Sequence, residues 1–95
     1  MAVAIEMVFK GATLDQYDQV MQKMGLSSPG SDRPDGALFH WVAKTSDGIK
    51  VVDVWESAEQ FDSFAAEQIG PFTQEVGIAG PPEMTRHELH NYLGG

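Results

Sequence analysis

The sequence of 95 residues has no cysteine, few basic residues and no long apolar run. The absence of cysteine excludes disulfides, thiol nucleophiles and thiolate metal sites. Acidic residues outnumber basic ones by 14 to 6, and the formal net charge of -8 repels nucleic acids and anionic membrane surfaces. No stretch approaches the roughly 20 apolar residues that cross a bilayer, and the N-terminus lacks a signal-peptide pattern. We therefore expect a cytoplasmic protein that binds neither nucleic acid nor membrane.

The composition is that of an ordinary globular chain, with 42% hydrophobic and 21% charged residues. A chain of this length forms one domain, residues 1–95, whose core is only marginally self-sufficient, so help from a partner chain is expected. The sequence contains no glycine-rich phosphate loop, nucleophile elbow or dinucleotide fingerprint. We therefore expect no nucleotide or other cofactor.

A β-hairpin is predicted between Gly36 and Glu56, with its turn at Thr45-Ser-Asp-Gly48. The sequence is compatible with two strand registers, one with Thr45 opposite Gly48 and one with a two-residue turn at Asp47-Gly48. In both registers, even positions of the first strand share a face with odd positions of the second. One face then carries Phe39, Trp41, Ala43, Val52 and Val54, and the other carries Leu38, His40, Val42, Ile49, Val51, Asp53 and Trp55. Because both faces are largely apolar, both are expected to be covered.

The residues before the hairpin predict a strand, a helix and a loop. Residues 2–10 alternate apolar side chains at strand spacing. Thr13-Leu-Asp-Gln16 has the form of a capping box at the start of a helix, and Gly25 is placed to end that helix in a left-handed conformation. Residues 26–35 are rich in Ser, Pro and Gly, which predicts a loop that is either a lid or a plain connector.

The residues after the hairpin predict a second helix and a last strand. Ser57-Ala-Glu-Gln60 again has the capping-box pattern at the start of a helix. Gly70-Pro71 is expected to stop this helix, and residues 72–76 could add another helical turn. The last strand is predicted over about residues 83–93, and its imperfect alternation indicates either a bulge or an edge strand that reaches a second subunit.

The order strand, helix, strand, strand, helix, strand predicts an α+β fold, a ferredoxin-like βαββαβ protomer. Its four-stranded antiparallel sheet has both helices on one face. We predict that the helices cover Phe39, Trp41, Val52 and Val54, the more aromatic side of the hairpin. The opposite face would then remain apolar and exposed, so we expect it to be covered by the same face of a second copy in a two-fold homodimer.

In this element order the chain resembles the dimeric α/β-barrel superfamily, which includes the antibiotic biosynthesis monooxygenase-like proteins. The resemblance covers nearly the whole chain, and its most recognisable segment is Val51-Val-Asp-Val-Trp-Glu-Ser57 leading into Glu59-Gln-Phe61. An acidic residue and a Trp two positions apart near the end of the third strand are common in such proteins. The resemblance implies a dimer whose sheets enclose pockets for small, mostly apolar molecules. It selects no single reaction, because relatives include cofactor-free oxygenases, haem degraders, isomerases and polyketide cyclases.

His40 and Asp53 are the candidate catalytic residues, because they lie directly across from each other or one diagonal apart on one face of the hairpin. A carboxylate beside an imidazole fixes its tautomer and makes the other ring nitrogen a stronger base. The candidate substrate-binding residues on the same face are Trp55, Leu38, Val42 and Val51. This arrangement predicts a cofactor-independent monooxygenase, isomerase or cyclase that acts on an apolar, aromatic or polyketide-like molecule. The alternative is a self-satisfied structural pair in a non-catalytic small-molecule-binding or stress-related protein.

The histidines near the C-terminus invite a metal interpretation that strand geometry opposes. His87 and His90 are three residues apart, and side chains at that spacing on a strand point to opposite faces. We therefore expect no metal site. Arg86 and Tyr92 share the parity of His90, so one of them could complete the pocket from the last strand. Haem binding follows only from the superfamily, and no residue of the sequence selects it.

Overall fold

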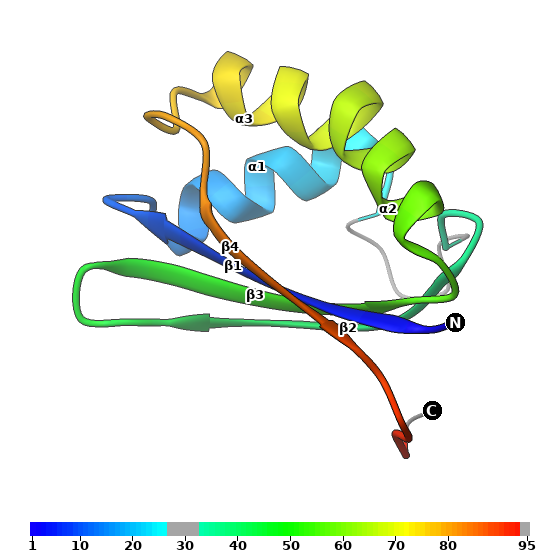
Figure 1. Cartoon of the computed structure of the whole chain (residues 1–95). Coiled ribbons are helices and arrows are strands. Elements are labelled where there is room, and N and C mark those ends of the chain that lie inside the picture. Colours follow the sequence, from blue (N-terminus) through cyan, green and yellow to red (C-terminus); the bar gives the residue numbers. More distant parts are fainter. Residues whose placement is uncertain (27–32, 94–95) are drawn as a thin grey trace.

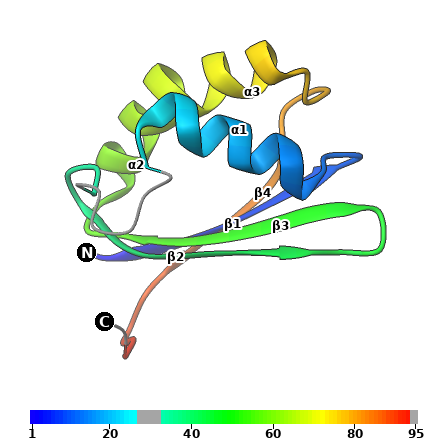
Figure 2. The same ribbon diagram turned by 180° about the vertical axis from the view of Figure 1, so that it is seen from behind.

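The computed structural model describes residues 1–26 and 33–93, in which one antiparallel sheet carries every helix on the same side (Figure 1). The sheet has four strands in the order β2-β3-β1-β4. The view from behind shows α1 and the α2–α3 helix lying side by side over that sheet (Figure 2). The ferredoxin-like βαββαβ prediction is confirmed. The strands are β1 (Val3–Lys10), β2 (Ala37–Lys44), β3 (Gly48–Trp55) and β4 (Glu83–Glu88), and the helical segments are α1 (Leu14–Met24), α2 (Ala58–Phe64), η1 (Ala65–Ile69) and α3 (Gly70–Val76).

The hairpin of β2 and β3 adopts the first of the two predicted registers. The Thr45 amide donates to the Gly48 carbonyl at 2.9 Å, and His40 pairs directly with Asp53. The register shifts once, between Ala37 and Phe39, as a bulge does. The loop predicted over residues 26–35 falls mostly on residues 27–32, which lie outside the described part of the chain.

Local signals placed α1 correctly. The Thr13 hydroxyl accepts from the Gln16 amide at 3.1 Å, and the Gln16 side chain accepts from the Thr13 amide at 3.0 Å, which completes the capping box. Gly25 ends the helix with φ at 75°, in the left-handed region where glycine carries no steric cost.

The prediction that the second helix stops at Gly70-Pro71 is wrong, but the further helical turn considered for residues 72–76 is present. The chain remains helical from α2 through the π-helical segment η1 into α3, which ends at Val76. In the π turn the Gly70 amide donates to the carbonyl of Ala65, five residues earlier. Pro71, which has no backbone N–H to donate, follows this π turn directly. The Thr73 hydroxyl bonds the Ile69 carbonyl at 2.6 Å, and thus satisfies a backbone group near the π turn.

β4 is shorter than predicted, because it ends at Glu88. The Leu89 amide donates to the Ala2 carbonyl at 3.0 Å, and the chain then turns away from the sheet. In Figures 1 and 2 the C-terminal segment passes beyond the sheet on the side away from the helices.

The two faces of the hairpin are the reverse of the prediction. The helices cover Ile49, Val51, Asp53 and Trp55, all of which are buried, whereas Phe39 and Trp41 lie on the open face with 39% and 41% of their surface exposed. The reason is β1, which pairs with β3 so that its strongly apolar residues share a face with Val51 and Asp53. Those residues of β1 form the core under the helices: Val3, Ile5, Met7 and Phe9.

Candidate functional site

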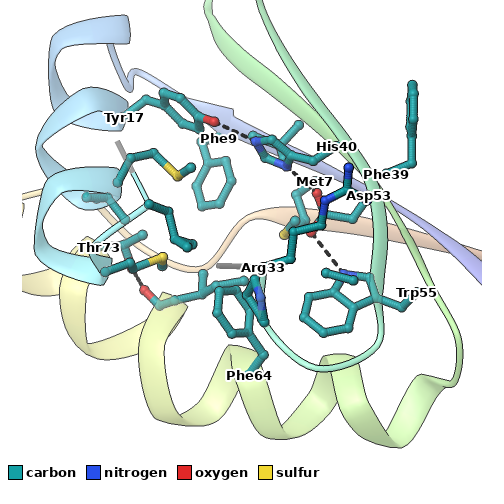
Figure 3. A pocket seen from close by; sticks show the side chains of 18 of the residues that line it. Met7, Phe9, Tyr17, Arg33, Phe39, His40, Asp53, Trp55, Phe64 and Thr73 are labelled. Atoms are coloured by element: carbon teal, nitrogen blue, oxygen red, sulfur yellow. Dashed lines mark hydrogen bonds and ion pairs between the residues drawn. The ribbon is translucent and has the colours of Figure 1, made fainter. Parts of the chain in front are cut away.

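A cavity of about 510 Å³ lies between the sheet and the helices of this one chain (Figure 3). We expected a pocket on the opposite face, between two sheets, and the reversed hairpin corrects that expectation. The lining is mainly apolar and sulfur-rich, with Met7, Phe9, Met21, Met24, Phe64 and Ile69. A cavity of this size and composition is of the kind that holds small apolar molecules.

A chain of hydrogen-bonded side chains forms the polar wall of the cavity. The Asp53 carboxylate accepts from His40 Nδ1 at 2.5 Å and from Trp55 Nε1 at 3.1 Å. The other ring nitrogen of His40, Nε2, lies 2.5 Å from the Tyr17 hydroxyl. Figure 3 shows these side chains following one another along the cavity, from α1 across the sheet. The carboxylate is 7% exposed and the imidazole 37%, so the imidazole is accessible from solvent whereas the carboxylate is buried.

Strand geometry and aromatic packing explain how the chain brings these groups together. His40 and Asp53 are directly paired residues of neighbouring strands, and Asp53 and Trp55 are two apart on one strand, so all three share a face. The Trp55 ring packs against Phe61 at 5.8 Å and Phe64 at 5.2 Å between centroids, which holds its N–H against the carboxylate.

Tyr17 sets the protonation pattern of the network. Burial, followed by the nearby negative charges of Asp53 and Asp18, raises the pKa of the Tyr17 phenol to about 12. The phenol is therefore neutral at physiological pH and can donate to His40 Nε2. When the phenol donates to Nε2, the ring proton of His40 lies on Nδ1, which donates to Asp53.

The predicted site residues divide into those that line the cavity and one that does not. His40, Asp53, Trp55, Leu38 and Val51 line it. Val42 does not line the cavity and instead packs against the core. Sequence reasoning missed Tyr17, which shares one helical stripe with the apolar residues Val20, Met21 and Met24. The only available signal was a hydroxyl group on an otherwise apolar stripe.

The polar residues of β4 take no part in the cavity. Arg86 pairs with Asp62 of α2, and its guanidinium lies 5.5 Å from the centre of the Phe61 ring. His87 contacts Glu6 at 2.9 Å on the open face. His90 lies beyond the end of β4 and is exposed.

Glu6 belongs to a charged cluster in the middle of the open face. Its carboxylate bonds Lys50 at 2.8 Å, and this bond, together with the bond to His87, lowers the pKa of the Glu6 carboxyl.

Within residues 1–26 and 33–93 no three His, Asp or Glu side chains come together as metal ligands do. No helix in that part of the chain has the length and apolar character of a membrane span.

The sequence matches no protein-family model and no curated protein, but solved structures match its fold over nearly its whole length. A Chloroflexus aurantiacus protein assigned to the antibiotic biosynthesis monooxygenases is 20% identical, with a TM-score of 0.62 over 99% of this chain and 98% of that one. This chain has the antibiotic biosynthesis monooxygenase-like fold. A variant of SnoaB, a cofactor-independent oxygenase of Streptomyces nogalater, has the same TM-score of 0.62 at 11% identity, over 99% of this chain and 97% of that one.

Other proteins with the antibiotic biosynthesis monooxygenase-like fold were solved with bound molecules. A Streptomyces coelicolor monooxygenase in complex with nanaomycin D matches at a TM-score of 0.56 and 20% identity, over 99% of this chain and 91% of that one. The haem degrader MhuD of Mycobacterium tuberculosis, with two haems bound, matches at 0.52 and 16% identity, over 99% of this chain and all of that one. These identities show a shared fold, and the fold alone is compatible with more than one chemistry.

Proposed function

We propose that the protein binds an apolar small molecule in its cavity and removes a phenolic or enolic proton from it, with His40 as the general base. The observation that carries the proposal is a part-exposed imidazole held by a buried carboxylate on the wall of an apolar cavity. Asp53 holds the proton on Nδ1 and leaves the lone pair of Nε2 directed away from it. The same carboxylate stabilises the imidazolium that forms when the base accepts a proton.

The cavity supports an aromatic or polyketide-like substrate. Its volume of about 510 Å³ suits a molecule of a few fused rings, and thioether and aromatic side chains adapt to flat apolar ligands. Trp55, Leu38 and Val51 would contact the ligand, whereas Val42 is no longer proposed to do so. Proton removal produces an electron-rich anion, and cofactor-independent oxygenation, isomerisation and cyclisation all begin from such an anion. The S. nogalater oxygenase and the nanaomycin complex support this class of chemistry for the fold.

The alternative is a protein that binds its small molecule without transforming it, including a stress-related binding protein. One observation favours it: in the described part of the chain, every buried side-chain nitrogen and oxygen already has a hydrogen-bond partner. Haem ligation by His40 has less support, because both of its ring nitrogens are already engaged by Asp53 and Tyr17.

A fluorescent phenol, 7-hydroxy-4-methylcoumarin, distinguishes the two functions, because its absorbance reports the ionisation of its hydroxyl group. If His40 is a base, binding to the wild-type protein lowers the apparent pKa of the probe by at least about one unit, a tenfold change in its ionisation constant. His40→Gln is expected to bind the probe without this shift, whereas the exposed control His90→Gln keeps it. Binding with an unshifted pKa in all three proteins would support the non-catalytic alternative.

We infer in addition that two copies of the chain associate through the sheet face opposite the helices. Phe39 and Trp41 expose large aromatic surfaces there, next to the partly exposed Val52. The C-terminal segment passes beyond the same face, where it would meet a second copy (Figure 1).

Sedimentation velocity is expected to give twice the mass of one chain for the wild type and a monomer for Trp41→Glu. Leu14→Glu is the matched control, because Leu14 is equally exposed, at 42%, but lies on the helix side. A monomeric wild type would refute the inference.

A further inference from the structure

The Tyr17 hydroxyl occupies the ring nitrogen of His40 that a substrate would have to reach. This hydroxyl lies 2.5 Å from Nε2 of His40, and Asp53 already occupies the only other ring nitrogen. A substrate hydroxyl could reach Nε2 directly only by displacing the Tyr17 hydroxyl. The phenol and imidazole planes are 10° apart with centroids 5.9 Å apart, so the two rings lie end to end and the Tyr17 hydroxyl is directed at Nε2. Tyr17 is also packed against the buried core.

We propose that Tyr17 is a catalytic residue that relays the proton from the substrate to His40, an inference that rests on the proposed function. The substrate O–H donates to the Tyr17 oxygen while the Tyr17 proton moves to Nε2. The substrate O–H bond and the original Tyr17 O–H bond break, and a new Tyr17 O–H bond and an Nε2–H bond form. The products are a substrate anion, a neutral tyrosine and an imidazolium paired with Asp53, with no change in oxidation state.

The electrostatics of the site favour this relay over a stepwise route. A pKa of about 12 makes a Tyr17 phenolate costly, chiefly because the ring is removed from water. In the relay Tyr17 is neutral before and after the transfer, so no phenolate has to accumulate. The charge that does form is placed on His40, where the buried Asp53 carboxylate already accepts a hydrogen bond.

The relay also defines where the substrate must carry its acidic group. The reacting oxygen bonds to Tyr17 on the α1 side of the cavity, beside Val20 and Met21, which also line it. The rest of the molecule would extend over the apolar lining towards Phe64 and Ile69. The substrate class is therefore a ring system with a phenol or enol at its edge.

Tyr17→Phe removes only the oxygen atom, and the 7-hydroxy-4-methylcoumarin titration tests its role. The relay predicts that the pKa shift of the bound probe is lost, with at least a tenfold fall in its ionisation constant, as in His40→Gln. Because the two residues act as one unit, the double variant is expected to show no further loss. Circular dichroism and thermal unfolding establish that each variant is folded.

The outcomes separate the relay from the proposed base. If Tyr17→Phe ionises the probe as well as or better than the wild type while His40→Gln does not, the relay is overturned and the base remains. If His40→Gln also ionises the probe normally, the proposed function fails. In the wild-type protein, nuclear Overhauser effects are expected between the Tyr17 ring and the probe protons that flank its hydroxyl. Contacts from those protons to the His40 ring alone would show displacement of Tyr17 and would also overturn the relay.

Discussion

Replacement of Asp53 separates the structural role of the network from its chemical role. In Asp53→Ala, the N–H groups of Trp55 and His40 lose their acceptor. His40 is 37% exposed and can bond water instead, but Trp55 is only 2% exposed and its N–H is left without a partner. An orphaned buried donor and a lost charge-assisted bond together cost about 2–4 kcal/mol of unfolding free energy. For a domain of this size, that loss lowers the melting temperature by at least about 8 °C.

Asp53→Asn has nearly the same shape and is expected to behave differently. Its amide oxygen can still accept from Trp55 Nε1, so the expected loss of unfolding free energy is below about 1.5 kcal/mol. Its NH₂ group, however, then faces His40 Nδ1 and can only donate to it. The imidazole must place its proton on Nε2, which removes the lone pair that accepts from Tyr17. The folded variant should therefore lack the base.

Urea unfolding followed by tryptophan fluorescence measures both stabilities, and ¹⁵N spectra of the histidine rings report the tautomer. The expected pattern is a large loss of stability for Asp53→Ala, a small loss for Asp53→Asn, and a change of tautomer in Asp53→Asn only. An unfolding free energy of Asp53→Ala within about 0.5 kcal/mol of wild type would show that the carboxylate does not hold the buried indole, and would refute the reasoning.

Three further predictions concern alkaline pH, a glycine and a helix cap. The pKa of Tyr17 is about 12 in the folded chain, against an ordinary value of 10.0. Its contribution to the unfolding free energy is therefore complete below pH 10 and is lost as the pH rises through about 12. In urea titrations at alkaline pH, the unfolding free energy of Tyr17→Phe should fall less steeply with pH than that of the wild type. Gly48→Ala should lower the unfolding free energy by about 1–3 kcal/mol, because its Cβ would lie 2.1 Å from the Phe9 carbonyl oxygen. A urea midpoint equal to that of the wild type would refute this close approach. Thr13→Ala should cost about 0.5–2 kcal/mol through loss of the cap on the Gln16 amide, and an unchanged thermal midpoint would count against that bond.

Much of the fold was predictable because its signals are local. The capping box at Thr13, the left-handed Gly25 and the turn at Thr45 to Gly48 each specify the backbone within a few residues. Alternation also predicted which residues of the hairpin share a face. It did not predict which face the helices cover, because both faces carry a Trp and several β-branched residues. That choice depends on how β3 pairs with β1, a contact that neither strand specifies alone.

The candidate site was predictable to the same extent. The pairing of His40 with Asp53 follows from strand register, and the structure confirms it. The contact between Tyr17 and His40 depends on how α1 lies across the sheet, which no local pattern determines. The unbroken passage of the helix through Gly70-Pro71 was not predicted, because Gly and Pro indicate a stop and no pattern in the sequence indicated the π turn that precedes them.

That π turn fixes the rotational phase between the two halves of the helix. In an α-helix, side chains five residues apart point about 140° away from each other, so Phe64 and Ile69 would face different directions. The wider winding of η1 brings both onto the wall of the cavity, and Thr73 follows one turn later. If the same residues wound as a regular α-helix, α3 would be rotated about its axis by roughly 100°. Ile69 and Thr73 would then leave the wall, so the spacing of residues in this helix is a determinant of the cavity's shape.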